Sequence, residues 1–325
     1  MDLLTAARSG DTAAFDRLVA PFRGELRAHC YRMLGALHDA DDAVREALLG
    51  AWRGLAGYEG PASLRSWLYR IATNVCLKQL RGRSKRLLSA DYFPAADDVW
   101  DIGEPRVDKA WVEPYPTGPE DSYEQRESVE LAFVAALQHL PATQRAVLVL
   151  REVLGFAAAE VAEMLDSSVA SVNSALQWAR ASLAERAPAK SQQATLAALG
   201  DAGQRALVAE LVAAWERADV PALVGMLTED VRLTMPPLPI WLDGLAMVRR
   251  FLAERIFATP WRLVPATVNG QLAFVAYQGQ PDETYTLGGV NVLSIEGDRI
   301  GAITSFLDPG TLTPFELPEF FRRDR

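Results

Sequence analysis

Cysteine and histidine are scarce in this 325-residue sequence. Its two cysteines, Cys30 and Cys76, lack the spacing of a metal site or a redox pair, which favours a reducing, cytoplasmic environment. The three histidines, His29, His38 and His139, all precede residue 140. The C-terminal half therefore has no histidine for a metal site or a Ser-His-Asp triad of its own. We expect neither a metal nor a cofactor.

Long apolar runs are also missing. No stretch of eighteen apolar residues exists, so we expect no membrane span and no membrane partner. The start of the chain, MDLLTAARSGD, lacks the basic residues and apolar core of a signal peptide. Both observations favour a cytoplasmic protein.

Positive charge is in short supply, with a net charge of −9, but it is unevenly distributed. Residues 1–86 hold 14 Lys and Arg against 9 Asp and Glu, whereas residues 87–130 hold 3 against 12. Residues 131–187 are nearly balanced, with 4 against 5. Only the first segment has the excess of cations that a polyanion such as DNA requires.

Hydrophobic periodicity predicts a multidomain chain. Residues 1–86 and 127–187 have helical spacing and form two all-α domains. The Pro-rich, acidic residues 87–126 form a linker between them, and residues 188–200 form a second linker. Residues 201–325 begin with helices and continue with alternating strands, which indicates an α+β domain.

The first linker carries aromatic residues that a freely solvated tether would not need. We expect Trp100, Trp111, Tyr115 and Tyr123 to pack against the helical domains or the α+β domain. Its acidic residues would then cover the basic run at 81–86 and act as a DNA mimic. The alternative is a disordered acidic tether.

Residues 157–180 have the spacing of a helix-turn-helix. Val161, Ala162 and Leu165 face inward on the first helix, Ser168 caps the second, and Val169, Val172, Leu176 and Ala179 anchor it. The outer face of the second helix suits contacts with phosphates and base edges. Together with the cap, its candidate DNA-binding residues are Ser168, Ser171, Asn173, Ser174, Gln177 and Arg180. The alternative is a helical hairpin with a solvated polar face.

The segment LPATQRAVLVLREVLGFAAAEVAEMLDSSVASVNSAL resembles the fourth conserved domain of extracytoplasmic-function (ECF) sigma factors of the sigma-70 family, which reads the −35 element. Upstream, DADDAVREALLGAWRGLAGYEGPASLRSWLYRIATNVCLKQLRGR resembles their second domain, which docks on RNA polymerase and reads the −10 element. WVEPYP and MPPLPIW resemble the subgroup with a fused SnoaL-like cone, at residues 201–325. The resemblance spans essentially the whole chain. It implies core RNA polymerase and promoter DNA as partners.

The resemblance also assigns roles to residues in the first domain. It places the polymerase-docking helix at Asp41, Asp42, Val44 and Leu48. Tyr58 and Trp67 would border the −10 strand, although both Trp52 and Trp67 suit a core. The cationic and polar residues implied at the DNA are Arg65, Arg70, Asn74, Lys78, Arg81, Arg83, Lys85 and Arg86.

Several positions depart from the family pattern by lacking a basic or polar residue. Trp178 stands where arginine is typical in the recognition helix, and Gly50, Val75 and Thr143 are further departures. Because each phosphate contact adds to affinity, these losses predict weaker binding to DNA.

The cone domain suggests a second function. Its candidate pocket residues are Trp215, Met235, Trp241, Trp261, Phe274, Tyr277, Asn291, Phe306 and Asp308. Such a pocket could hold a small-molecule ligand. Acid–base chemistry there would fall to Asp230, Asp243, Asp308 or Tyr277.

Two hypotheses follow. In the first, the chain is a sigma factor that binds core RNA polymerase, directs initiation at specific promoters and is regulated by its cone. In the second, it is a repurposed cyclase, isomerase or hydrolase of natural-product biosynthesis that has lost DNA binding.

Overall fold

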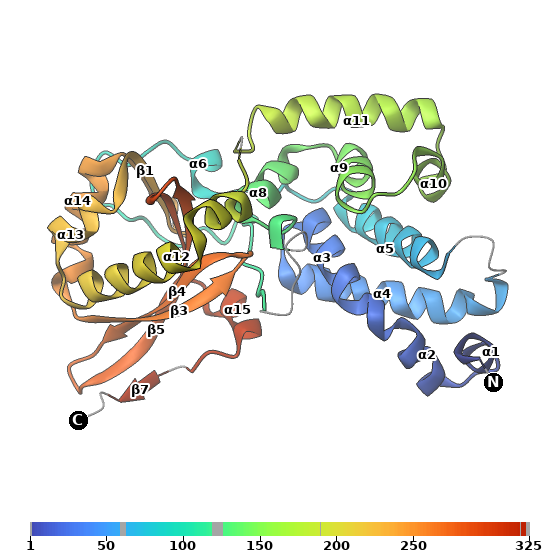
Figure 1. The fold of residues 1–325 in the computed structure, drawn as a ribbon, viewed down its shortest axis with the longest axis horizontal. Helices are drawn as coiled ribbons and strands as arrows, with labels where there is room; N and C mark the ends of the chain where they lie inside the picture. Colours follow the sequence, from blue (N-terminus) through green and yellow to red (C-terminus); the bar gives the residue numbers. More distant parts are fainter. Residues whose placement is uncertain (1, 59–62, 119–125, 189, 319, 323–325) are drawn as a thin grey trace. The chain divides into compact units, whose positions relative to one another are not determined.

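The computed structural model describes residues 2–58, 63–118, 126–188, 190–318 and 320–322 (Figure 1). The chain forms two compact units. The first comprises residues 1–86 and 132–187, and the second comprises residues 87–131 and 188–325. Each unit is therefore built from two separate stretches of chain. Of the linker aromatics, Tyr123 lies outside the described residues.

Helices build the described part of the first unit. Before residue 87 these are α1 (Leu3–Arg8), α2 (Thr12–Val19), α3 (Arg23–Leu34), α4 (Leu37–Gly54) and α5 (Leu64–Leu80), with short 3-10 turns at Ala20–Phe22 and Leu55–Gly57. After residue 131 they are α8 (Leu131–His139, whose first residue belongs to the second unit), α9 (Ala142–Leu148), a π-helical segment at Val149–Val153, α10 (Ala158–Met164) and α11 (Val169–Ala184).

Local chemistry sets the ends of these helices. The Ser63 hydroxyl accepts the Ser66 amide at 3.0 Å and caps α5, and the Ser168 hydroxyl accepts the Ser171 amide at 3.1 Å and caps α11. Helix α3 ends at Gly35, whose φ of 72° is the left-handed conformation that glycine adopts most easily. Leu26, Leu68 and Val172 are among the buried side chains that hold the helices together.

The second unit contains a mixed sheet. Its described helices are α6 (Ser89–Tyr92), α12 (Gln192–Glu216), α13 (Val220–Gly225), α14 (Leu245–Glu254) and α15 (Pro309–Leu312), with 3-10 turns at Ile256–Ala258 and Thr313–Phe315. Its strands are β1 (Leu227–Thr234), β2 (Trp241–Asp243), β3 (Trp261–Val268), β4 (Gln271–Gly279), β5 (Thr284–Glu296), β6 (Arg299–Phe306) and β7 (Phe320–Arg322).

The strand order is β2-β1-β6-β5-β4-β3, with β7 paired to β5. Only β1 and β6, among the described pairs, run parallel. One face contributes Leu233, Phe274 and Leu293 to a core with Leu211 of α12 and Phe251 of α14. Figure 1 shows α12 running along the sheet. This arrangement of helices over a curved sheet is the expected α+β cone.

Residues 87–118 and 126–131 fold onto the cone. Val99 is fully buried in the core of the cone, and the Ala96 amide donates to the Trp241 carbonyl at 3.0 Å. The Trp241 indole N–H donates to the Phe93 carbonyl at 2.8 Å, and the Arg106 amide donates to the Pro237 carbonyl at 2.9 Å. The linker is therefore an integral layer of the second unit.

Two other linker aromatics also find partners within the second unit. The Trp111 indole N–H donates to the Arg106 carbonyl at 3.0 Å, and the ring stacks near Phe93 with centroids 6.4 Å apart. The Tyr115 amide donates to the Asn269 side-chain oxygen at 2.9 Å. The contact of Tyr115 with the cone agrees with the prediction, whereas these partners of Trp111 belong to the linker itself.

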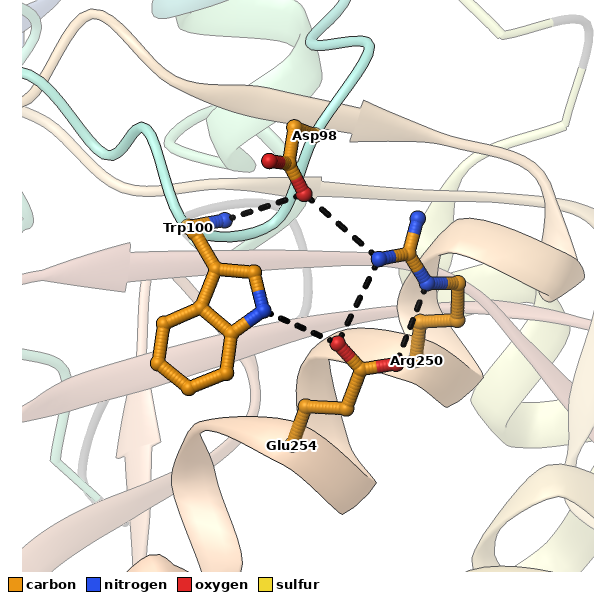
Figure 2. A network of polar contacts seen from close by, with 4 residues as sticks. All are labelled: Asp98, Trp100, Arg250 and Glu254. Atoms are coloured by element: carbon orange, nitrogen blue, oxygen red, sulfur yellow. Dashed lines mark hydrogen bonds and ion pairs between the residues drawn. The ribbon is translucent and has the colours of Figure 1, made fainter.

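A polar cluster ties Trp100 to helix α14. Figure 2 shows the Trp100 indole N–H donating to Glu254 at 3.1 Å, while Arg250 bridges Glu254 and Asp98. The guanidinium of Arg255 lies 4.8 Å from the centre of the Trp100 ring. Hydrogen bonds from Arg250, with one from Trp100, hold the pKa of Glu254 below its ordinary value. The cluster therefore attaches the linker to α14 at the surface of the cone.

Helix α12 begins inside residues 188–200, which the sequence analysis assigned to a second linker. The carboxylate of Glu130 accepts the amides of Gln192 at 2.9 Å and Gln193 at 2.7 Å. Gln192 also exchanges two hydrogen bonds with the backbone of Ile295. Buried glutamines thus attach this stretch to the sheet, and only Gly200, with a φ of 69°, interrupts the helix.

Candidate nucleic-acid interface

Helix α5 carries an exposed polar stripe. Arg70, Asn74 and Lys78 follow one another at four-residue spacing, and all three are exposed. Lys78 forms an ion pair with Glu46 at 3.1 Å. The structure therefore brings three of the predicted DNA-binding residues onto one surface.

Arg65 lies instead against the second helical stretch. Its guanidinium donates to the Leu154 carbonyl at 3.4 Å and lies 4.8 Å from the centre of the Phe156 ring. Nearby, the Ser66 hydroxyl bonds Glu160 at 3.4 Å, and the Asn74 amide reaches the Met164 carbonyl at 3.5 Å. Residues 154–164 thus cover part of α5.

The basic run after α5 is engaged within its own unit. Arg81 is exposed at the C-cap of α5. Arg83 and Arg86 both pair with Asp39, at 3.2 Å and 2.7 Å, and the Lys85 ammonium donates to the His139 carbonyl at 2.8 Å. Arg83, Lys85 and Arg86 thus have partners inside the first unit.

The predicted polymerase-docking helix is α4. Asp41 accepts hydrogen bonds from the Nε and Nη2 atoms of Arg27, at 2.6 Å and 3.0 Å. Asp42 forms an ion pair with Arg45. Val44 is half-buried and Leu48 is buried, so Leu48 belongs to the helical core. The exposed apolar side chain is Leu49, at 56% exposure, which the sequence analysis missed. Leu48 stands at the same spacing from Asp41 as Leu49 does from Asp42, so the spacing alone does not distinguish the two leucines.

Two of the tryptophans of the first unit, Trp52 and Trp67, have aromatic neighbours. Trp52 packs edge-on against Phe15 with centroids 5.2 Å apart, and Trp67 lies 4.9 Å from Tyr58. Tyr58 itself is largely buried. These contacts give Trp52 and Trp67 a packing role in the described state.

Helices α10 and α11 form the helix-turn-helix, with Asp166 in the left-handed conformation at the turn, at a φ of 54°. Val172, Leu176 and Ala179 are buried as predicted. Val169 is 44% exposed because the helix starts there, ahead of the packed turns, so its predicted anchoring role is wrong.

The outer face of α11 is polar and accessible. Ser168 is the exposed N-cap, and Ser171, Asn173, Ser174 and Gln177 are exposed on the helix. Arg180 is paired with Glu152 at 2.7 Å. Trp178, at 67% exposure, adds a large apolar surface to the same side as Ser171 and Ser174.

Comparisons with known proteins agree with this geometry. Family models for Sigma-70 region 2, Sigma-70 region 4 and a SnoaL-like domain match residues 18–86, 130–183 and 208–303. The ECF RNA polymerase sigma factor SigG of Mycobacterium tuberculosis is 40% identical over 322 residues, covering 96% of this chain and 85% of SigG. The chain belongs to the ECF sigma factors.

Other relatives match part or most of the chain. The ECF sigma factor SigM of M. tuberculosis is 33% identical over 186 residues, covering 56% of this chain and 82% of SigM. The crystal structure of the M. tuberculosis ECF sigma factor SigJ covers 91% of this chain, at 22% identity and a TM-score of 0.59. The fold of the sigma factor described here thus has a solved counterpart.

The candidate catalytic residues of the sigma factor do not form one site. Asp230 and Asp243 are exposed, and Asp243 pairs with Arg232 at 3.5 Å. Asp308 accepts the Thr311 amide at 2.9 Å and caps α15. Tyr277 is buried, and burial raises its pKa. Asp243, Asp308 and Tyr277 thus have structural roles, Asp230 is simply exposed, and the enzymatic alternative is not favoured.

The candidate pocket residues are divided between the two faces of the sheet. Strand register puts Phe274 opposite Asn291, on the face of the core, and Met235, Trp215 and Trp261 pack into that core. Phe306 is paired with Val290 and lies on the other face. Trp241 is paired with Thr234 and lies on that face as well. Tyr277 also lies there, because the β3–β4 ladder pairs it with Arg262, next to the core pair Leu263 and Ala276. These residues therefore cannot all line one cavity.

A groove of about 750 Å³ does lie on the cone, between α12 and β3. Its lining includes Val208, Val212, Pro265 and Leu272 and none of the predicted pocket residues. Among the described residues, no group of three His, Cys, Asp or Glu could hold a metal ion, and no helix is long and apolar enough to cross a membrane.

Proposed function

We propose that this sigma factor binds core RNA polymerase in the cytoplasm and directs it to specific promoters through its first unit. The observation that carries the proposal is the α10–α11 helix-turn-helix, whose second helix exposes Ser171, Asn173, Ser174 and Gln177. Such side chains reach base edges in the major groove. Ser168 and Arg180 flank this surface and would contact the DNA backbone.

The −10 element would be read by α5 and the residues after it. Arg70, Asn74 and Lys78 form the exposed stripe. Arg65, which contacts Leu154 and Phe156, would join this surface once those residues move away. Arg81, Arg83, Lys85 and Arg86 extend the basic surface beyond the helix. Because residues 154–164 contact Arg65, Ser66 and Asn74, the described arrangement is a closed one that must open before α5 takes up DNA.

Core polymerase would dock on α4. Asp41, Asp42 and Val44 remain candidates for this surface, and Leu49 takes the place of the buried Leu48. Leu49 is 56% exposed, so docking on polymerase would bury its apolar side chain.

The cone would regulate the sigma factor by holding the tether between its two promoter-reading domains. Residues 87–131 connect the two stretches of the first unit, yet they fold with the cone. Released and extended, 45 residues could reach about 150 Å, whereas folded residues hold their two ends at a fixed separation. Attachment of the linker would therefore oppose any separation of the two domains on polymerase.

The decisive experiment is a core-polymerase pull-down followed by run-off transcription with the full-length chain. We expect binding and promoter-dependent transcripts. Leu49→Lys should weaken the pull-down at least about tenfold, because it places a charge in a desolvated contact. Leu3→Lys changes another exposed leucine, at 37% exposure, and should have no effect. Failure of the unaltered chain to bind core polymerase would overturn the proposal.

A further inference from the structure

The first unit contains a pocket of about 160 Å³ at the junction of its two stretches of chain. Four cationic side chains line it: Arg83, Lys85, Arg86 and Arg145. The carboxylate in the lining is that of Asp39, and Leu34, Leu80 and Leu140 are among the apolar lining residues. The pocket is thus strongly positive.

Arg145 is the most unusual of these cations because it is only 3% exposed. Its guanidinium donates to the backbone carbonyls of Met33, Gln138 and Leu140 and to the side-chain oxygen of Gln138. All of these acceptors are neutral, and its Nε atom is buried without a hydrogen-bond partner. Burial lowers the pKa of Arg145 to about 10, so the group is still a cation at neutral pH. A buried charge without a counterion is costly.

The lining holds one carboxylate against four cations. That carboxylate, Asp39, is already shared by Arg83 and Arg86. The lining therefore has an excess of positive charge beside the buried guanidinium. A bound anion would supply the missing counter-charge.

We propose that this pocket binds a compact, multiply charged phosphate-type anion of the size of pyrophosphate. The volume greatly exceeds the roughly 10–15 Å³ that one water needs, so a larger group fits. Guanidinium groups bind phosphate oxygens in pairs, and an ammonium adds a point charge. Arg83, Lys85 and Arg86 precede residue 87 and Arg145 follows residue 131, so the anion would join both stretches of the first unit.

The test is calorimetric titration of the full-length chain with inorganic pyrophosphate in a low-salt, magnesium-free buffer. We expect one binding site per chain and a higher midpoint of thermal unfolding with pyrophosphate present. Arg83→Gln and Lys85→Gln should each weaken binding about tenfold, because each removes one charge-assisted contact. No binding by the unaltered chain would overturn the proposal.

Two substitutions elsewhere provide a matched control. The Arg23–Asp16 pair resembles the Arg83–Asp39 pair in distance, and the two arginine side chains are 49% and 50% exposed. Arg23→Gln should leave pyrophosphate binding unchanged. Equal losses in Arg23→Gln and Arg83→Gln would show non-specific charge attraction and would refute the site.

Asp39→Asn should change the affinity for pyrophosphate in the opposite direction and is the most discriminating variant. It removes the competing carboxylate from the lining, so pyrophosphate should bind more tightly, whereas Asp16→Asn should bind as the unaltered chain does. Circular dichroism would confirm that both variants are folded. Unchanged or weaker binding by folded Asp39→Asn would contradict the proposal.

A DNA backbone phosphate has the same chemistry, so a short duplex is the second arm of the experiment. We expect pyrophosphate to bind in the absence of DNA. Because Arg83 also belongs to the proposed DNA-binding surface, duplex binding by itself does not decide between the two sources. Binding of the duplex without any binding of pyrophosphate would show that DNA is the source of the phosphate and would overturn the free-anion site. Calorimetry requires no transcription, so this result stands apart from that of the polymerase pull-down.

Discussion

At the scale of single residues, buried polar groups hold the first unit together. Arg145 joins α9 to the end of α3 through Met33 and to the end of α8 through Gln138 and Leu140. These carbonyls have been taken out of water. Their hydrogen bonds therefore matter more than those of an exposed arginine.

Arg145→Met should destabilise the protein by about 3 kcal/mol, because it leaves buried carbonyls unpaired at roughly 1–3 kcal/mol each. The measurement is the free energy of unfolding in urea, with the slope checked for two-state behaviour. Arg23→Met, at a half-exposed arginine, serves as the control and should change stability by less than about 0.5 kcal/mol. A loss no larger than that of the control would contradict the assigned role.

His29 makes stability depend on pH. Its Nε2 lies 2.9 Å from the Thr73 hydroxyl, and burial, with Arg32 nearby, lowers its pKa from 6.5 to about 3. Below pH 6.5 the unfolded chain therefore binds a proton that the folded chain does not. Acidification through the window from 6.5 to about 3 must consequently reduce stability.

From pH 7 to pH 5, this single group should lower the free energy of unfolding by about 2 kcal/mol. Urea unfolding at both pH values measures the difference. His29→Gln removes the titration, so its stability should change less between the two pH values even if it is lower at each. An identical pH dependence in His29→Gln would exclude His29 as the cause.

At the scale of elements, the buried side chains and the N-cap of α11 could be predicted from the sequence. Val172, Leu176 and Ala179 are buried as the spacing predicted, and Ser168 caps the helix. The ion pair of Arg180 could not be predicted from the sequence, because its partner Glu152 is 28 residues away. Trp178 leaves the exposed face of this helix with little positive charge.

Trp178→Arg should strengthen DNA binding and make it more sensitive to salt. One added phosphate contact should change the slope of log K against log salt by about −0.9. Fluorescence anisotropy with a promoter duplex at several salt concentrations gives the slope. Val107→Arg, at a linker position that is 94% exposed, is the control for added charge alone. Equal slopes in both variants would argue against a role for position 178.

The linker is a second element whose state depends on burial. Val99 is 0% exposed and Val107 is 94% exposed, so one residue type is tested in two environments. Val99→Asp places a charge in the core of the cone and should detach the segment around it. Limited proteolysis should then cut residues 94–110 much faster, whereas Val107→Asp should behave as the unaltered chain. Protection of the linker in Val99→Asp would contradict its attachment through this residue.

At the scale of the whole molecule, the tether between the two promoter-reading domains belongs to the cone. Val99→Asp should therefore raise the affinity for core polymerase as well, since a detached tether no longer opposes separation of the domains. Surface plasmon resonance against immobilised core polymerase measures this, with Val107→Asp as control. If the linker of Val99→Asp becomes cleavable but the affinity for core polymerase does not change, release of the tether does not regulate binding. That result would refute the regulatory proposal.

The sequence by itself determined the family, the order of the helical and α+β regions and the helix-turn-helix, because these depend on local periodicity and motifs. Only tertiary structure decided which side chains are available. Leu49 in place of Leu48, the division of the pocket residues between two faces, and the start of α12 inside a presumed linker all depend on distant partners. The linker shows the reason most clearly. Val99 and Val107 are identical in chemistry, and a core formed by residues 196–303 buries one of them and leaves the other in water.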